Sequence, residues 1–238
     1  MGVTSRVLVV QHEDDDPIHL MGIWMEDVDL TTLRPYVDDD VPPTMKGYDG
    51  LVVMGGAMGA HDDKGSPWLP ATRELIRAAA ADRVPTLGIC LGHQLCTVAL
   101  GGEVAKNPAG RQLGLLEVGW GAAAVDDSLL GPVVGPRRAM HWNDDIVTRL
   151  PDGAVQLATA STGEVQAARH AETVWGVQWH PEVDDSLIRE WATDGTLSPV
   201  DEARLLDELV RSRGELDDAW RPLARSFSTL VRTASRVG

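Results

Sequence analysis

Three short runs of apolar, mostly β-branched residues mark the first part of the chain. They are RVLVVQ at 6–11, DGLVVMGG at 49–56 and VPTLGIC at 84–90. Apolar residues fill these runs almost without interruption, which is typical of strands buried on both faces. Between the second and the third, the segment 67–83 has apolar residues at helical spacing, namely Leu75, Ile76, Ala79 and Ala80. Strand, helix and strand at these distances predict a parallel α/β sheet with right-handed crossovers.

After the third run, the pattern of apolar residues changes from helical to strand-like and then back to helical. LGHQLCTVALGG, directly after Cys90, predicts a helix of about three turns that ends at its two glycines. Strand-like pieces between 113 and 180 predict that a mixed sheet extends the parallel core. From 184 onward, apolar positions recur at helical spacing, as in Leu205, Leu206, Leu209 and Val210. We therefore expect an α/β domain over 1–183 and a helical extension of two or three helices over 184–238, packed on the same domain.

Composition and charge narrow the function classes. Of the 238 residues, 36 are acidic and 21 are basic, which gives a formal net charge of -15. Such a field repels phosphate backbones and anionic membrane surfaces, so neither nucleic acid nor membrane is expected as a partner. Two acidic runs, Glu13–Asp16 and Asp38–Asp40, are interpreted as solvated loops.

The two cysteines are not expected to form a disulfide. Cys90 and Cys96 lie six residues apart, and a helical rotation of about 100° per residue puts them on different faces. The first apolar run is too short for a signal peptide, and no segment reaches the roughly 20 apolar residues of a membrane span. These features predict a reduced cytoplasmic protein. No metal-ligand spacing is present, and neither a metal nor a cofactor is expected.

Cys90 ends the third strand and stands between Gly88 and Gly92. Small neighbours suit a sharp strand-to-helix turn that holds out a reactive residue, and the helix N-terminus favours the thiolate. The alternative is a small buried cysteine in a tight turn. A nucleophilic cysteine needs a base and an orienting partner, and WHPE at 179–182 offers both in His180 and Glu182. In an extended segment these two side chains project to the same side.

Attack on a carbonyl also needs hydrogen-bond donors for the oxyanion that develops. The N–H of Leu91, which follows the cysteine, is one natural donor. The second can come from GGAMG at 55–59, which ends the second strand. A simple turn is the alternative role for this glycine run.

GGAMG, GICLGHQL and WHPE, in this order, resemble the motifs of the class I glutamine amidotransferase family. The similarity runs from about residue 45 to 183 and is closest to stand-alone domains similar to the amidotransferase part of GMP synthase. It implies a flavodoxin-like α/β fold, with a central, mostly parallel or mixed sheet flanked by helices, and a Cys-His-Glu triad that cleaves glutamine through a γ-glutamyl thioester.

The resemblance assigns roles to individual residues. Cys90 is implied as nucleophile, His180 as general base and acid, and Glu182 as the group that orients it. Gly56 and Leu91 are implied as donors of N–H groups to the oxyanion, and Gln94 is implied as a residue that binds glutamine. His93 also follows the pattern, with a structural role.

One segment fits the family less well. AMHWNDDIV at 139–147 stands where relatives have a loop that lines the glutamine pocket, with a histidine and an aspartate. His141 and Asp144 are the candidates for substrate binding, and Asp145 matches the aspartate equally well. A surface turn is the alternative.

No acceptor domain follows residue 183, so we expect a glutaminase that acts on L-glutamine and delivers ammonia to a separate synthase partner. The first alternative is a γ-glutamyl hydrolase or transferase that acts on γ-glutamyl peptides or amides with the same thioester. The second is a non-catalytic regulatory domain.

Overall fold

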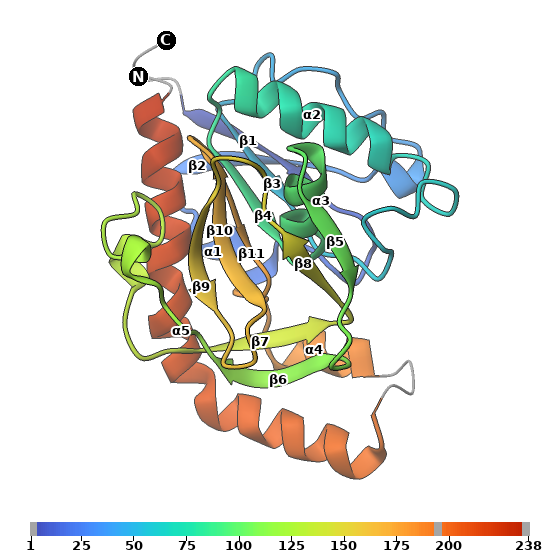
Figure 1. The fold of residues 1–238 in the computed structure, drawn as a ribbon, viewed down its shortest axis with the longest axis vertical. Helices are drawn as coiled ribbons and strands as arrows, with labels where there is room; N and C mark the ends of the chain where they lie inside the picture. The colour runs from blue at the N-terminus through green and yellow to red at the C-terminus, as the bar shows by residue number, and fades with distance from the viewer. Residues whose placement is uncertain (1–3, 193–196, 235–238) are drawn as a thin grey trace.

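A seven-stranded mixed sheet forms the centre of the protein. The computed structural model describes residues 4–192 and 197–234 (Figure 1). The strand order is β2-β1-β3-β4-β11-β10-β9. The strands are β1 (Ser5–Val10), β2 (Val28–Leu33), β3 (Gly50–Val53), β4 (Thr86–Ile89), β9 (Val155–Thr159), β10 (Val165–Ala171) and β11 (Val174–Val177). The pairs from β2 to β11 are parallel, whereas β10 is antiparallel to both of its neighbours. The prediction of a parallel core extended by a mixed sheet is confirmed.

Both faces of the sheet are buried, which explains the uninterrupted apolar runs. Leu8 and Val10 belong to one core with helices α2 (Leu69–Ala81) and α3 (Leu91–Ala99). Val7 and Val9, on the opposite face of the same strand, belong to a second core. Helices α1 (His19–Trp24) and α5 (Pro199–Ala234) cover that second face (Figure 1). Alternate residues of one strand thus pack into different cores.

Two small two-stranded sheets stand beside the central one. They pair β5 (Glu103–Lys106) with β8 (Asp145–Arg149), and β6 (Gln112–Glu117) with β7 (Arg138–Asn143), in antiparallel fashion. Segment 139–147 is therefore neither a long loop nor a surface turn, because only Asp144 lies between β7 and β8. In the part of the chain that the structure describes, three short 3-10 helices cover Pro35–Val37, Ala122–Ala124 and Gly131–Val133.

The described residues of the tail form two helices, α4 (Asp185–Ala192) and α5, in agreement with the predicted two or three. The apolar face of α5 includes Trp220 and Phe227, which are 1% and 0% exposed and share the core of β1 and α1. Arg138 of β7 forms ion pairs with Glu208 and Glu215 of α5. We propose that this tail is an extension of the α/β domain, because it shares the core of that domain. Of the described helices, none combines the length and apolar composition needed to cross a membrane.

Candidate active site

Cys90 occupies a sharp turn between β4 and α3. Its backbone has φ 49° and ψ -106°, and it is one of four described non-glycine residues with positive φ. Two glycines make the turn possible. A Cβ on Gly92 would collide with the carbonyl of Val53 in β3, and one on Gly88 would collide with the backbone of Gly92. The glycines therefore let α3 begin in direct contact with the sheet, and Cys90 stands at the N-terminal end of that helix.

His180 and Glu182 lie beside Cys90, in the segment that follows β11. Strand β11 ends at Val177, so the strand does not continue to these two residues. The two side chains nevertheless meet, with Nδ1 of His180 2.7 Å from Oε1 of Glu182. The backbone N–H of His180 donates to Met140 O at 2.8 Å and fixes the segment. All three side chains of the expected triad are buried, Cys90 at 6%, His180 at 3% and Glu182 at 0% exposure.

The charges around His180 favour its protonated form. Burial lowers the pKa of His180, but the neighbouring Glu182 and Cys90 raise it, and the net result lies well above the ordinary histidine value. Gln178 Nε2 additionally donates to Cys90 Sγ at 3.5 Å. A protonated His180 at this position is able to give a proton to a leaving group.

Gly56 and Leu91 lie side by side next to Cys90. A Cβ on Gly56 would come within 3.1 Å of Leu91 Cδ2. Leu91 is the first residue of α3, so its N–H has no acceptor within the helix. Gly56 and Cys90 line the same cavities, and Leu91 directly follows Cys90 in the chain.

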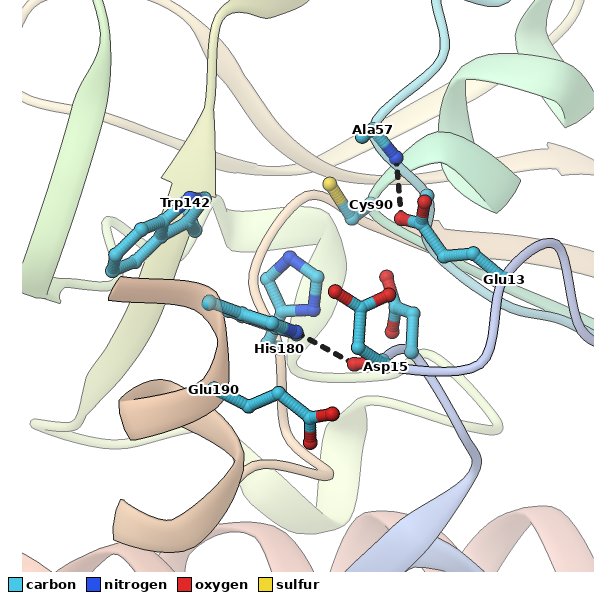
Figure 2. Close-up of a pocket in the computed structure, with 10 residues that line it drawn as sticks. Glu13, Asp15, Ala57, Cys90, Trp142, His180 and Glu190 are labelled. Carbon is cyan, nitrogen blue, oxygen red and sulfur yellow. Dashed lines mark hydrogen bonds between the residues drawn. The ribbon is translucent and has the colours of Figure 1, made fainter. Parts of the chain in front are cut away.

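Two cavities meet at Cys90. The first, called here the mixed-charge cavity, has a volume of about 300 Å³, and its lining includes Gln94, Lys106, Arg111, Asn143, Asp144 and Asp145. The second, called the acidic cavity, has a volume of about 240 Å³, and its lining includes Glu13, Asp15, Asp16, His180, Glu190 and Trp191. Gly56, Ala57, Cys90 and Trp142 line both. In the acidic cavity, Glu13 and Asp15 lie on the side away from Trp142 (Figure 2).

Gln94 and Asp144 lie in the mixed-charge cavity. Gln94 Nε2 donates to the carbonyl of Asp145 at 3.1 Å. Asp144 accepts two hydrogen bonds from Arg111, at 3.0 and 2.6 Å, and this contact lowers the pKa of its carboxyl. The cavity therefore combines basic and acidic side chains, which are the two kinds of charge that can bind the carboxylate and the ammonium group of a free amino acid.

The structure does not bring His141 to either cavity. Its side chain is fully buried in β7, with its ring 6.4 Å from the ring of Trp179. Burial, and then the charge of His180, lowers the pKa of His141 to about 4. The next residue, Trp142, points into the cavities instead, because side chains alternate along a strand.

The acidic run Glu13–Asp16 is not the solvated loop that charge patterning suggested. Asp14 is exposed and accepts a hydrogen bond from Tyr36 at 2.7 Å, but Asp16 is only 4% exposed. Glu13 accepts the N–H of Ala57 at 2.6 Å. A signal for this placement was present, because the run follows β1 and the carboxyl ends of parallel strands collect functional groups. The second run, Asp38–Asp40, is exposed as expected.

Glu190 and Trp191 were not identified from the sequence. They come from α4, and the ring of Trp191 packs edge-on against His180 with 4.7 Å between ring centres. Its Nε1 donates to the carbonyl of Asp15 at 2.6 Å. No motif marks these two residues, because only the tertiary fold brings α4 to the cysteine.

One group of described residues, Asp16, His180 and Glu182, brings three possible metal ligands within 4.8 Å of one another. Because His180 Nδ1 is already hydrogen-bonded to Glu182, the group is better suited to holding a charged imidazole than a metal ion.

Two other candidates are structural. Cys96 is fully buried, which raises the pKa of its thiol to about 12, and both cysteines are free. His93 is also fully buried and pairs with His170, with 3.0 Å between His93 Nδ1 and His170 Nε2. Burial lowers the pKa of both rings, that of His170 to about 3.

Comparisons with solved structures agree with this architecture. A crystal structure of a glutamine amidotransferase from Thermotoga maritima is 23% identical, covers 95% of this chain and 99% of its own, and has a TM-score of 0.83. A glutamine amido transferase from Methylobacillus flagellatus is 26% identical, with 96% of both chains covered and a TM-score of 0.83. The α/β fold expected for the family is confirmed.

Sequence comparisons identify relatives that match most of the chain. A glutamine-hydrolyzing GMP synthase subunit from Methanosarcina mazei is 35% identical over 169 residues, 69% of this chain and 81% of the relative. The protein of the same name from Methanococcoides burtonii is 43% identical over 175 residues, with the same coverage of 69% and 81%. The family model of class I glutamine amidotransferases matches residues 25–190, which include Cys90, His180, Glu182 and both donor positions. The chain therefore belongs to the class I glutamine amidotransferase family.

Proposed function

We propose that the protein hydrolyses the side-chain amide of glutamine through a γ-glutamyl thioester on Cys90 and supplies the ammonia to a separate synthetase protein. The observation that carries this proposal is the position of Cys90. It stands on a turn with positive φ, beside the buried His180–Glu182 pair, in the wall shared by two cavities.

The mixed-charge cavity suits the amino-acid end of glutamine. The basic side chains of Lys106 and Arg111 favour the α-carboxylate, and the carboxylates of Asp144 and Asp145 favour the α-ammonium. Gln94, in the same cavity, is proposed to contact the bound glutamine. Substrate held in this way extends its side-chain amide toward Cys90.

The reaction then follows from the groups around the carbonyl. The Cys90 thiolate attacks the γ-carbon, and the N–H groups of Gly56 and Leu91 hold the oxyanion. His180 gives its proton to the nitrogen, the C–N bond breaks, and ammonia leaves. The neutral imidazole next takes a proton from water, which attacks the thioester and releases glutamate. Glu182 orients His180 through Nδ1, so that Nε2 serves the reaction.

The proposed partner follows from the names of the relatives. Several are named as one subunit of a glutamine-hydrolyzing GMP synthase, which implies that the enzyme has at least one more. We propose that such a second protein receives the ammonia. We also place the protein in the cytoplasm, because its two cysteines are free thiols.

A second function, hydrolysis or transfer of γ-glutamyl groups from peptides or amides, is favoured by one observation. The acidic cavity adds space at Cys90 beyond the mixed-charge cavity that suits glutamine. Because the chain belongs to an enzyme family and retains Cys90, His180 and Glu182, the non-catalytic alternative has no support.

The test is glutamine turnover together with mass spectrometry of the intact protein. Wild-type protein should release ammonia from glutamine and carry a transient glutamyl adduct on the peptide that contains Cys90. Cys90→Ala should lose both. Cys96→Ala is the matched control and should retain both, because that thiol is buried in the core. Turnover by Cys90→Ala at the wild-type rate would contradict the proposal.

A further inference from the structure

The two cavities at Cys90 differ in charge. In the mixed-charge cavity, two basic residues accompany two carboxylates. The lining of the acidic cavity contains the carboxylates of Glu13, Asp15, Asp16 and Glu190, and no lysine or arginine is among the described residues that line it. An amino-acid zwitterion fits the first cavity, whereas the second, with four carboxylates and His180 in its lining, favours positive charge.

Asp16 gives this cavity a specific site for a cation. The residue is 4% exposed, and its Oδ1 is buried without a hydrogen-bond partner among the described residues. A buried carboxylate oxygen without a partner is costly. Burial, and then the nearby carboxylates, raises the pKa of Asp16 well above its ordinary value although His180 opposes the shift. Burial and Asp15 likewise raise the pKa of Glu13. A bound cation would give Asp16 Oδ1 a partner and would stabilise the charged forms of Asp16 and Glu13.

The remaining walls suit an aliphatic chain. Trp142 and Trp191 pack against each other, with 5.8 Å between ring centres, and both line the cavity. The bond from Trp191 to the carbonyl of Asp15 holds its ring in place. Indole rings offer apolar surface to methylene groups and attract a cation to their faces.

The size of the cavity also exceeds what glutamine requires. A volume of about 240 Å³ is many times the 10–15 Å³ or so that holds one water molecule, and ammonia is about the size of water. A leaving group with several more heavy atoms than ammonia would fill the space.

We infer that the acidic cavity binds the amine half of a γ-glutamyl amide and selects amines that carry a second, positively charged amino group. The inference rests on the thioester chemistry proposed for Cys90 and names a substrate class for it. Cys90 sulfur bonds to the γ-carbon, the C–N bond breaks, and His180 protonates the nitrogen, which leaves as the free amine. Water then splits the thioester and yields glutamate, while the released amine takes up a proton.

Three γ-glutamyl amides of similar length test the charge preference. They are the amides of 1,4-diaminobutane, of pentylamine and of 4-aminobutyrate, which are cationic, neutral and anionic at the distal end. We expect kcat/KM to be at least about tenfold higher for the cationic amide than for the neutral one, as charge-assisted hydrogen bonds allow. The anionic amide should be the poorest substrate.

A double variant, Asp15→Asn with Glu190→Gln, should bring the ratio of kcat/KM for the cationic and neutral amides toward one. The ratio is measured on one preparation, so a general loss of activity cancels. Asp14→Asn is the matched control, because Asp14 lies on the same loop but is exposed and outside the cavity. It should keep the wild-type ratio.

The outcomes separate this inference from the proposed function. If glutamine is hydrolysed but the cationic and neutral amides react equally, or neither reacts, the inference is overturned and the proposed function stands. If neither glutamine nor any amide is turned over, both are overturned.

Discussion

A single hydrogen bond, from His180 to Glu182, connects the proposed general base to a buried carboxylate. Glu182→Gln keeps the shape of that side chain and removes its charge. Glutamine turnover should fall by about 10² or more, by analogy with other orienting residues. Because Glu182 raises the pKa of His180, the alkaline limb of the kcat/KM profile should also move to lower pH. The measurement is the pH–rate profile for ammonia release.

The shift of the alkaline limb separates an electrostatic role from a structural one. A variant that is merely misfolded would lose rate at every pH without moving the limb. Glu117→Gln, at an exposed glutamate at the end of β6, is the control and should resemble wild type. A near-normal rate in Glu182→Gln would mean that the orienting role is assigned to the wrong residue.

Short motifs identified more of the site than charge patterning did. Cys90, His180 and Glu182 were named from residue type and spacing, Gln94 was named from the family resemblance, and the fold brings them together. His141 was named from a weak match, and strand β7 turns it into the core. Spacing alone does not tell which side of a strand faces a cavity. Nor does charge tell whether an aspartate is solvated, which is why Asp16 was missed.

The packing of helix α3 depends on its close approach to the sheet. Substitutions at two glycines, one at this contact and one away from it, should change the free energy of unfolding in opposite directions. Gly92→Ala would push α3 away from the Val53 carbonyl and should lower the free energy of unfolding by about 1–3 kcal/mol. Gly214→Ala is the control, because Gly214 is exposed within α5 and has free space around it. It should raise the free energy of unfolding by about 0.5–1 kcal/mol. Urea denaturation measures both, and a neutral Gly92→Ala would contradict the packing argument.

Strands marked by a continuous apolar run could be predicted from the sequence, whereas strands that form only by pairing with another strand could not. Strands β1, β3 and β4 are buried on both faces and appear as plain apolar runs. Strand β2, VDLTTL, is an edge strand with polar residues, and only its pairing with β1 makes it a strand. Likewise, β7 and β8 form by pairing with β6 and β5, which lie far away in the sequence.

At the scale of the whole molecule, the C-terminal helices connect the core to the site. Helix α5 packs in the core of the sheet through Trp220 and Phe227, and α4 supplies Glu190 and Trp191 to the acidic cavity. The side chain of Arg213 in α5 also donates to the carbonyl of Val183 at 2.8 Å, directly after the WHPE motif. Changes in the tail can therefore alter the site without touching the cysteine turn.

The buried pair of His93 and His170 limits the acid tolerance of the protein. Together with His12 and His141, these rings stay neutral in the fold because burial lowers their pKa values. Unfolded histidines titrate near pH 6.5, so below about that pH the unfolded chain binds more protons and the free energy of unfolding falls as the pH drops. Above it, all four are neutral in both states and contribute no pH dependence.

His170→Gln should therefore reduce the slope of unfolding free energy against pH, between about pH 6 and 5, by about 1 kcal/mol per pH unit. His61→Gln, at an exposed histidine, should leave the slope unchanged, and urea denaturation over a pH series measures both. An unaltered slope in His170→Gln would mean that the ring already accepts a proton in the fold. Otherwise, mild acid unfolds this protein from within, because each of these four imidazoles must leave the core to keep a proton that it gains.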